Sequence, residues 1–186
     1  SSTPAVANIE YILKTARISN HVVVTRTIDP TLLELNRSGY LNGHTPFSAY
    51  LSFVSILVAA LNDQKYVALS NERSSNYGNV KYLGKEINHQ YSKSLSYENK
   101  FRDYIKEYMS SSIDYFSFLR PLYEIQIASL FSKFPQYFDD FRSCNVGQKE
   151  GIWCGKCAKC LFNFMILSPF LSLDVLIQIF GSNLFE

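Results

Sequence analysis

The sequence predicts an α/β fold, with a mainly parallel sheet and helices on both of its faces. Two observations support this prediction. Short apolar runs, "HVVVTR", "KYVALS" and "DYFSFL", alternate with longer helical segments, an order typical of layered α/β proteins. The run "KYVALS" is almost continuously apolar, as expected of a strand that is buried on both faces of a parallel sheet. We therefore expect a single α/β domain over residues 1–186.

Two helices carry recognisable start and stop signals. In "DPTLLELNRSG", Asp29 is expected to cap the helix, with Pro30 at its first position and Gly39 at its end. The segment "TPFSAYLSFVSILVAAL" begins at Thr45 and is apolar on most sides, so a buried helix is expected. Its serines form one narrow stripe of small residues, suited to close approach of another backbone: Ser48, Ser52 and Ser55.

The other segments are assigned by their periodicity. Helices are expected in "TPAVANIEYILKTARI", "YENKFRDYIKEYM" and "LYEIQIASLFSKF", whereas the polar stretch from Asn71 to Tyr97 shows no clear period. The apolar segment "LFNFMILSPFLSLDVLIQIF" has the length of a membrane span, but Pro169 divides it and polar residues interrupt it. We therefore expect two short C-terminal helices packed on a core, and no membrane span.

Composition narrows the class of protein. Hydrophobic residues make up 47% of the chain and charged residues 18%, which is typical of a globular protein. The net charge of +2 offers no electrostatic basis for binding nucleic acid. No secretory signal is recognisable at the start of the chain, so we expect a cytoplasmic location.

All four cysteines lie in one segment, "CNVGQKEGIWCGKCAKC", with the spacing C-x9-C-x2-C-x2-C. This spacing favours a structural zinc site with four sulfur ligands: Cys144, Cys154, Cys157 and Cys160. A redox pair or an iron–sulfur cluster would use the same residues and stays open as an alternative. Nearby cations are expected to offset the negative thiolates: Arg142, Lys149, Lys156 and Lys159. A closed four-cysteine zinc site stabilises a fold and performs no chemistry.

Polar residues follow each predicted strand and suggest a cleft that binds an anion. The first exit holds Thr25, Arg26 and Asp29, the second Ser70 to Asn76, and the third Arg120. "NGHTP" precedes the apolar helix, whose N-terminus is a favourable seat for a carboxylate or phosphate. "NHQYSKS" adds His89 and Lys93. Ordinary loop polarity and a plain N-cap at Thr45 remain the alternatives on these residues alone.

Sequence segments of this chain resemble those of two protein families. The cysteine segment resembles the zinc loop of 7-cyano-7-deazaguanine synthase, an ATP-pyrophosphatase with the adenine-nucleotide α-hydrolase-like fold. The closer resemblance is to the UDP-N-acetylmuramoyl-L-alanyl-L-glutamate epimerase family of peptidoglycan synthesis. It is carried by "TRTIDPTLLELN", "LNGHTPFSA", "ALSNERSSNYGN", "NHQYSKS", "FRDY", "YFSFLRPLYEIQIASLF" and "FRSCNVG…WCGKCAKCLF". These phrases cover most of Val22 to Leu167 in order.

The resemblance implies an ATP- and Mg²⁺-dependent isomerase that inverts the terminal glutamate of the UDP-muramoyl dipeptide through an acyl-adenylate. The candidate groups for proton exchange are His44 and His89, with Lys93 or Glu72 behind them. The candidate substrate or nucleotide contacts are Asn42, Gly43, Thr45, Asn71, Arg73, Ser74 and Arg120. Two other functions stay open: another adenylating enzyme of the same fold, such as a deazaguanine synthase-like protein, and a non-catalytic zinc-stabilised interaction domain.

The sequence departs from the pattern of this fold in lacking the Gly-rich pyrophosphate loop. A segment resembling S-G-G-x-D-S would follow the first strand, and this sequence has none. We therefore expect a C-terminal fragment of a longer enzyme, with a partial Rossmann-like sheet and an incomplete ATP site. Such a fragment is expected to be inactive by itself.

Overall fold

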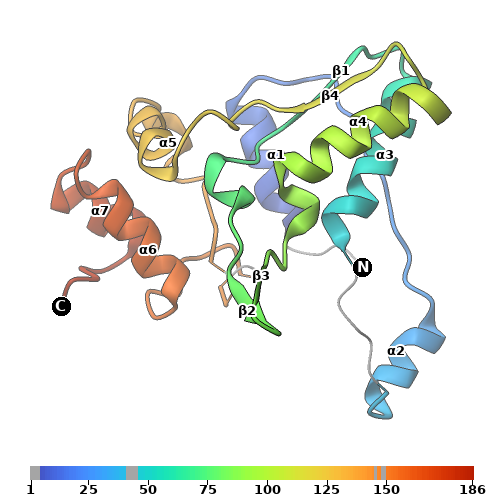
Figure 1. The fold of residues 1–186 in the computed structure, drawn as a ribbon. Helices are drawn as coiled ribbons and strands as arrows, with labels where there is room; N and C mark the ends of the chain where they lie inside the picture. Colours follow the sequence, from blue (N-terminus) through green and yellow to red (C-terminus); the bar gives the residue numbers. More distant parts are fainter. Residues whose placement is uncertain (1–4, 41–45, 145, 148–149) are drawn as a thin grey trace. The chain divides into compact units, whose positions relative to one another are not determined.

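The computed structural model describes residues 5–40, 46–144, 146–147 and 150–186 (Figure 1). The chain divides into two compact units. Unit 1 combines Ser1–His21 with Leu122–Glu186, and unit 2 is Val22–Pro121. The single domain expected over residues 1–186 stays a prediction.

Unit 2 contains a small parallel sheet. Strand β1 (Tyr66–Leu69) pairs in parallel with β4 (Asp114–Ser117), so that Tyr66 faces Asp114 and Leu69 faces Ser117. Both strands follow the predicted positions, and the parallel pairing is confirmed. Between them along the chain lies helix α4 (Leu95–Tyr108), which Ser94 caps by accepting a hydrogen bond from the Tyr97 backbone N–H.

An antiparallel hairpin lies within the polar stretch from Asn71 to Tyr97, whose sequence shows no helical or strand periodicity. Strands β2 (Val80–Tyr82) and β3 (Lys85–Ile87) are joined by two residues with positive φ, Leu83 and Gly84. Such turns usually hold Asn-Gly or Asp-Gly, because most side chains resist a positive φ. Leucine at the first turn position hid the hairpin from sequence-based prediction.

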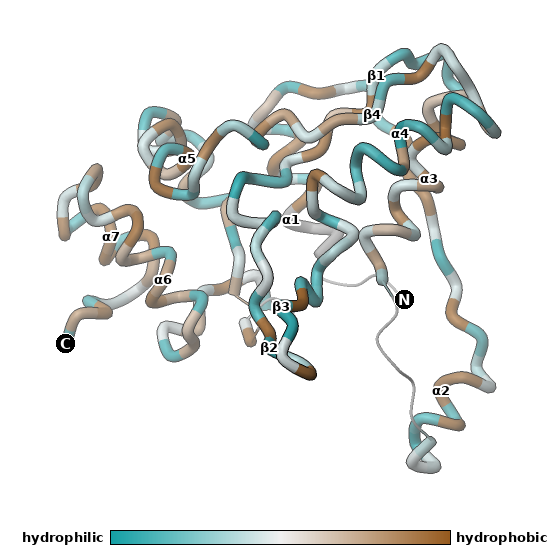
Figure 2. The backbone as a smooth tube through the Cα atoms, viewed as in Figure 1, coloured by the Kyte–Doolittle hydropathy of each residue, from teal (hydrophilic) through white to brown (hydrophobic). Residues whose placement is uncertain are grey.

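One core joins the sheet of unit 2 to helices α3 (Phe47–Leu61) and α4. Its buried members are Ile56, Ala59, Phe101, Ile105, Ile113 and Tyr115. Only Ser52, Ile56 and Ala59 of α3 are buried, so the expectation of a helix buried on most sides was wrong for this unit. Figure 2 shows the contrast between the largely hydrophobic α3 and the hydrophilic α4. Helices on both faces of the sheet stay a prediction.

The first expected strand is absent from the described structure. Val22, Val23 and Val24 form no strand, and Val23 is 76% exposed. A β-branched run becomes a strand only where a neighbouring strand accepts its hydrogen bonds, and the described sheets contain two strands each. The following helix α2 (Pro30–Arg37) is as predicted: Asp29 accepts from the Thr31 N–H at 2.8 Å.

Unit 1 is helical around an aromatic core. It contains α1 (Ala5–Thr15), α5 (Glu124–Phe131), a 3₁₀ turn η3 (Pro135–Tyr137), α6 (Ala158–Leu167) and α7 (Leu173–Phe180). Trp153 packs between Phe141 and Phe180, with ring centroids 5.2 and 4.6 Å away. The two C-terminal helices are confirmed. In the part of the chain that the structure describes, no helix combines the length and apolar character needed to cross a membrane.

The serine stripe of α3 meets a side chain rather than a backbone. Ser52 donates to the Ser48 carbonyl at 2.9 Å, so Tyr115, 2.8 Å away, donates its hydroxyl proton to Ser52. Tyr115 is 2% exposed, and burial raises its pKa to about 12. An unfolded tyrosine ionises near pH 10. Between these values the unfolded state binds fewer protons than the folded state, so stability falls as pH rises.

We therefore expect the free energy of unfolding to decrease from pH 10 to 12, and Tyr115→Phe to reduce this slope by about 1 kcal/mol per pH unit. Urea unfolding followed by circular dichroism at several pH values measures it. Tyr66→Phe, at a position 67% exposed, is the matched control. An equal slope in wild type and Tyr115→Phe would contradict this role of the buried hydroxyl.

Candidate functional site

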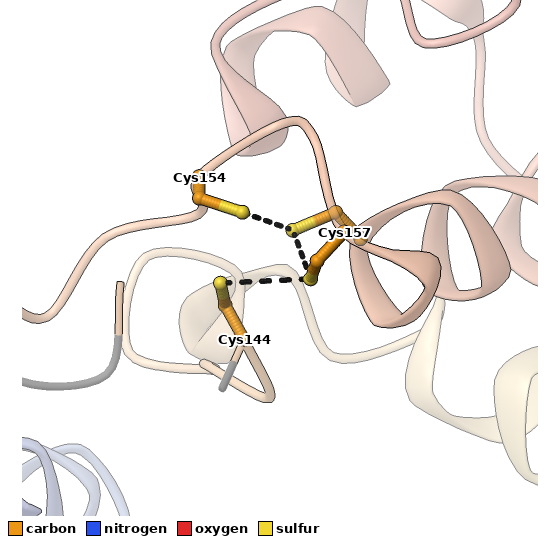
Figure 3. A group of neighbouring side chains, drawn as sticks. Cys144, Cys154 and Cys157 are labelled. Carbon is orange, nitrogen blue, oxygen red and sulfur yellow. Dashed lines mark hydrogen bonds between the residues drawn. The ribbon is translucent and has the colours of Figure 1, made fainter. Parts of the chain in front are cut away.

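The four cysteines of unit 1 converge on one point (Figure 3). All four sulfur atoms lie within 4.8 Å of one another, and none is in a disulfide. The Sγ–Sγ distances are 3.9 Å for Cys144–Cys157, 3.7 Å for Cys154–Cys160 and 3.5 Å for Cys157–Cys160. A tetrahedron with metal–sulfur bonds of about 2.3 Å has edges of about 3.8 Å. The arrangement therefore fits a single four-coordinate metal ion.

The loop that presents these sulfurs depends on two glycines. Gly155, between Cys154 and Cys157, has φ of +67°, which favours glycine. A Cβ added at Gly147 would lie 2.4 Å from the Ile152 carbonyl oxygen, so a side chain there would displace the loop. The Gly147 backbone N–H also donates to Cys144 Sγ at 3.1 Å.

The protein environment shifts the pKa values of Cys144 and Cys160 in opposite directions. Burial opposes ionisation of Cys144, but the hydrogen bonds donated by the Gly147 and Cys154 backbone lower its pKa to about 6. Burial, followed by the hydrogen bond with Cys157, raises the pKa of Cys160 to about 12. The protein alone therefore holds a mixture of thiolate and thiol, and a bound cation would replace the remaining protons.

Arg142, expected to offset the charge of the thiolates, makes its hydrogen bonds to backbone carbonyls. Its Nε donates to the Gly151 carbonyl at 2.9 Å and its Nη1 to the Phe141 carbonyl at 2.6 Å. The guanidinium thus braces the cysteine loop through backbone carbonyls. Lys149, also expected near the thiolates, lies outside the described residues.

A second polar centre lies in unit 2, where the chain leaves β1 and β4. Arg120 Nη2 donates to Glu98 Oε2 at 3.0 Å, and the two side chains are only 11% and 6% exposed. Ser117, at the end of β4, donates to the same carboxylate oxygen at 2.6 Å and accepts from Asn71 at 3.1 Å. The exits of β1 and β4 therefore meet, as the parallel sheet predicted.

A cavity of about 460 Å³ opens beside this centre in unit 2. One wall is the start of α3, from Pro46 to Ala49, and the other is the segment from His89 to Lys93 with Tyr97. The second wall includes the 3₁₀ turn η2 (Tyr91–Lys93). None of the described lining residues is acidic, and the ammonium of Lys93 has no hydrogen-bond or ion-pair partner among the described residues. The cavity therefore suits an anionic group.

The tautomer of His89 follows from its contacts with Asn79. The His89 backbone N–H donates to Asn79 Oδ1 at 3.2 Å, which orients the amide so that Nδ2 donates to His89 Nδ1. Neutral His89 then carries its proton on Nε2. In this form the ring is ready to donate a hydrogen bond, and it can accept a proton only after that contact changes.

The predicted site residues thus divide into three groups. His89 and Lys93 line the cavity. The strand-exit residues lie in or next to the polar centre: Asn71, Glu72, Arg73, Ser74 and Arg120. Asn42, Gly43, His44 and Thr45 lie outside the described residues. Arg26, at the end of the expected first strand, lies with its guanidinium carbon 5.2 Å from the Phe47 ring centroid.

Sequence reasoning missed Glu98, although a signal for it exists. Glu98, Phe101 and Ile105 are all buried on α4, at the spacing of one helix face. A carboxylate at a core position of an amphipathic helix must find a buried partner, because an unpaired buried charge is very costly. That pattern predicts that Glu98 has a buried partner, and the structure identifies the partner as Arg120.

Two family models match the chain. The MurL N-terminal domain matches residues 3–118, and the MurL C-terminal domain matches residues 140–186. The first match covers helix α1 and unit 2 as far as residue 118, just before Arg120, and the second covers the cysteine loop with α6 and α7. No solved structure matches the chain.

Three similar relatives are each named UDP-N-acetyl-alpha-D-muramoyl-L-alanyl-L-glutamate epimerase. The relative from Xanthomonas oryzae pv. oryzae is 41% identical over 88% of this chain and 38% of its own length. Those from a Micromonospora species and Salinispora tropica are 38% and 39% identical, over 89% and 86% of this chain and 41% and 36% of their own lengths. The chain thus spans about two-fifths of the length of these relatives.

We expect Glu98→Gln to destabilise unit 2 by about 3 kcal/mol, because it leaves the Arg120 charge buried without a counter-ion. Glu34→Gln is the matched control: it removes a carboxylate from the Arg37–Glu34 pair, in which both side chains are at least 68% exposed. That change should cost less than about 1 kcal/mol. Urea unfolding curves of the two variants compare them. Equal losses would show that burial of the Arg120–Glu98 pair has no energetic consequence.

Proposed function

Since the chain belongs to the MurL family, we propose that it forms part of an enzyme that inverts the α-carbon of the terminal L-glutamate of UDP-N-acetylmuramoyl-L-alanyl-L-glutamate. The observation that carries this proposal is the pair of family matches, supported by relatives 38–41% identical that bear the epimerase name. The reaction would place the protein in peptidoglycan precursor synthesis. We further propose a cytoplasmic location, a compartment in which free cysteines stay reduced.

The chemistry explains why ATP and Mg²⁺ belong to the proposal. A proton beside a carboxylate is too weakly acidic to be removed at a useful rate, because the product would carry adjacent negative charges. Adenylation of that carboxylate by ATP removes its charge and makes an enolate accessible. A base then removes the proton, and return of a proton to the opposite face inverts the centre. Pyrophosphate leaves in the adenylation step, and hydrolysis of the acyl-adenylate afterwards frees AMP and the inverted product.

The cavity of unit 2 is our candidate for the glutamate end of the substrate. Lys93 supplies a positive charge without an internal partner among the described residues, and Nε2–H of His89 supplies a donor. Both would stabilise the carboxylate of the substrate and the negative charge that develops on the enolate. His44 and His89 stay our candidates for proton exchange, with Glu72 and Lys93 behind them. Asn42, Gly43 and Thr45 are proposed contacts next to the start of α3.

The fold proposal is an adenine-nucleotide α-hydrolase-like sheet. The parallel pairing of β1 with β4, and the helices α3 and α4 on the shared core, support it. The Gly-rich loop that would cradle pyrophosphate is absent from the sequence. The chain alone is therefore expected to bind substrate without completing adenylation.

A direct test of the site is binding of the UDP-muramoyl dipeptide to the isolated chain, measured by nuclear magnetic resonance titration. We expect Lys93→Gln to weaken binding by about tenfold, the equivalent of one lost charge-assisted contact. Lys106→Gln, exposed in the last turn of α4, should leave affinity unchanged. Equal affinity in wild type and Lys93→Gln would exclude the cavity as the binding site for the anionic end.

The reaction itself can be tested in a chimera. Here the chain would replace the matching segment of the Xanthomonas relative, and deuterium incorporation from solvent at the glutamate α-carbon would be followed. Loss of exchange in His89→Ala or His44→Ala, with pyrophosphate release retained, would identify the proton-exchange group. Full exchange in both variants would rule out both histidines.

We propose that the metal of the four-cysteine cluster is zinc. Four thiolates at tetrahedral distances are a typical structural zinc site, and such a site supplies folding free energy. Metal analysis should find about one Zn²⁺ per chain. Cys157→Ser should lower this content and destabilise unit 1, which the fluorescence of Trp153, the single tryptophan, would report. Ser168→Ala, on the same unit, is the control. Iron in place of zinc, or no metal at all, would contradict the proposal.

A further inference from the structure

Arg120 holds three segments of unit 2 at once. Its Nη1 donates to the Glu72 carbonyl at 3.0 Å and to Ser75 Oγ at 2.7 Å, both in or next to the 3₁₀ turn η1 (Arg73–Asn76). Its Nη2 donates to the Lys93 carbonyl at 2.8 Å and to Glu98 on α4 at 3.0 Å. One planar guanidinium thus joins η1, η2 and α4 at the end of β4.

These contacts leave Arg120 little capacity for a ligand. Both terminal nitrogens face protein acceptors, and the third nitrogen, Nε, is buried and has no partner among the described residues. The side chain is 11% exposed. A substrate anion would have to displace Glu98 or the backbone carbonyls to reach the guanidinium.

We propose that Arg120, rather than contacting substrate as expected from the sequence, is the positioning residue for Lys93 in the cavity. Lys93 ends the 3₁₀ turn η2, a three-residue element held internally by the Lys93 N–H to Gln90 carbonyl bond at 2.8 Å. Its carbonyl accepts from Arg120 at 2.8 Å, so the backbone at this point is held from outside the turn. The Ser75 hydroxyl lies 3.1 Å from the same carbonyl, but its single proton is directed to the nearer Glu72 carbonyl at 2.7 Å. The choice of ligand for Lys93 rests on the proposed function of the cavity. The hydrogen bonds by which Arg120 holds η1, η2 and α4 do not, because they are made within the protein.

The geometry of arginine is essential to this role. Its planar guanidinium holds several N–H donors in fixed directions, so it can bind acceptors from different segments at the same time. A lysine ammonium instead offers a point charge with rotatable donors. Arg120→Lys would keep the positive charge beside Glu98 and lose the simultaneous grip on η1 and η2. This substitution therefore separates positioning from charge compensation.

The first experiment is amide hydrogen exchange on the full chain. In Arg120→Lys the amides of Lys93 and Ser94 should exchange at least about tenfold faster, while sheet amides such as Phe118, bonded to the Leu69 carbonyl, change by less than about twofold. Arg102→Lys is the matched control, because the hydrogen bond of Arg102 goes to Asn99 on its own helix. Unchanged exchange at Lys93 and Ser94 would overturn the proposal.

The second experiment is a double-mutant cycle with the UDP-muramoyl dipeptide as probe. Arg120→Lys should weaken binding about tenfold in wild type but less than about twofold in the Lys93→Gln background, because it acts through Lys93. Equal losses in both backgrounds would mean that Arg120 acts independently, as a direct contact would, and would overturn the proposal. If wild type fails to bind the probe, the proposed function of the cavity fails, and the exchange experiment still decides the positioning role.

A second variant guards against misfolding of Arg120→Lys. Ser75→Ala removes one acceptor of Nη1, together with the hydroxyl that donates to the Glu72 carbonyl and lies 3.1 Å from the Lys93 carbonyl, and leaves the Arg120–Glu98 pair intact. The same two amides should exchange faster, by a smaller factor than in Arg120→Lys. If the sheet amides are accelerated equally in both variants, the clamp is a general stability element and the positioning role is rejected.

Discussion

The buried pair of Arg120 and Glu98 is the constraint on which unit 2 depends. A charge of either sign cannot stay in such a site alone, because its desolvation is not compensated. Glu98 is fixed by its place on the buried face of α4, one turn before Phe101. Arg120 must therefore approach that point from the end of β4, and its remaining donors gather the two 3₁₀ turns around it. Electrostatics, rather than apolar packing, sets the course of these loops.

Unit 1 instead brings together four side chains that carry the same charge when they ionise. Its four sulfurs lie within 4.8 Å of one another, so full ionisation without a counter-ion would be strongly unfavourable. Unit 2 compensates its buried charge with a side chain of its own, whereas the sulfurs of unit 1 are placed so that one cation could compensate them all. The sulfurs come from a loop and the first turn of α6, and Cys160 has no exposed surface in the core beside Phe164. A metal ion bound by these sulfurs would therefore act directly on the core of this unit.

Much of the fold follows from local sequence signals. The caps of α2, the strands β1 and β4 and the four converging cysteines could be predicted because each depends on residues close in the sequence. The strand expected at Val22–Val24 is not formed, because a strand needs a neighbouring strand as partner and local sequence does not reveal whether one is present. The hairpin escaped because Leu83 is an unusual turn residue. The role of Arg120 could not be predicted from its position after a strand, since burial and the partner Glu98 decide it.

Stereochemical inversion places a further requirement on the site. An enolate is planar, so deprotonation and reprotonation from opposite sides need protein groups on two faces. The cavity of unit 2 has two walls from separate segments, the start of α3 and the segment from His89 to Lys93. A closed four-cysteine metal site has no open coordination position and cannot supply either group. His89 stands on one wall, whereas His44, two residues before Pro46 in the sequence, lies outside the described residues. Among the described residues, His89 alone places an imidazole beside the cavity, so the proposed inversion would require a second group that acts from the opposite face.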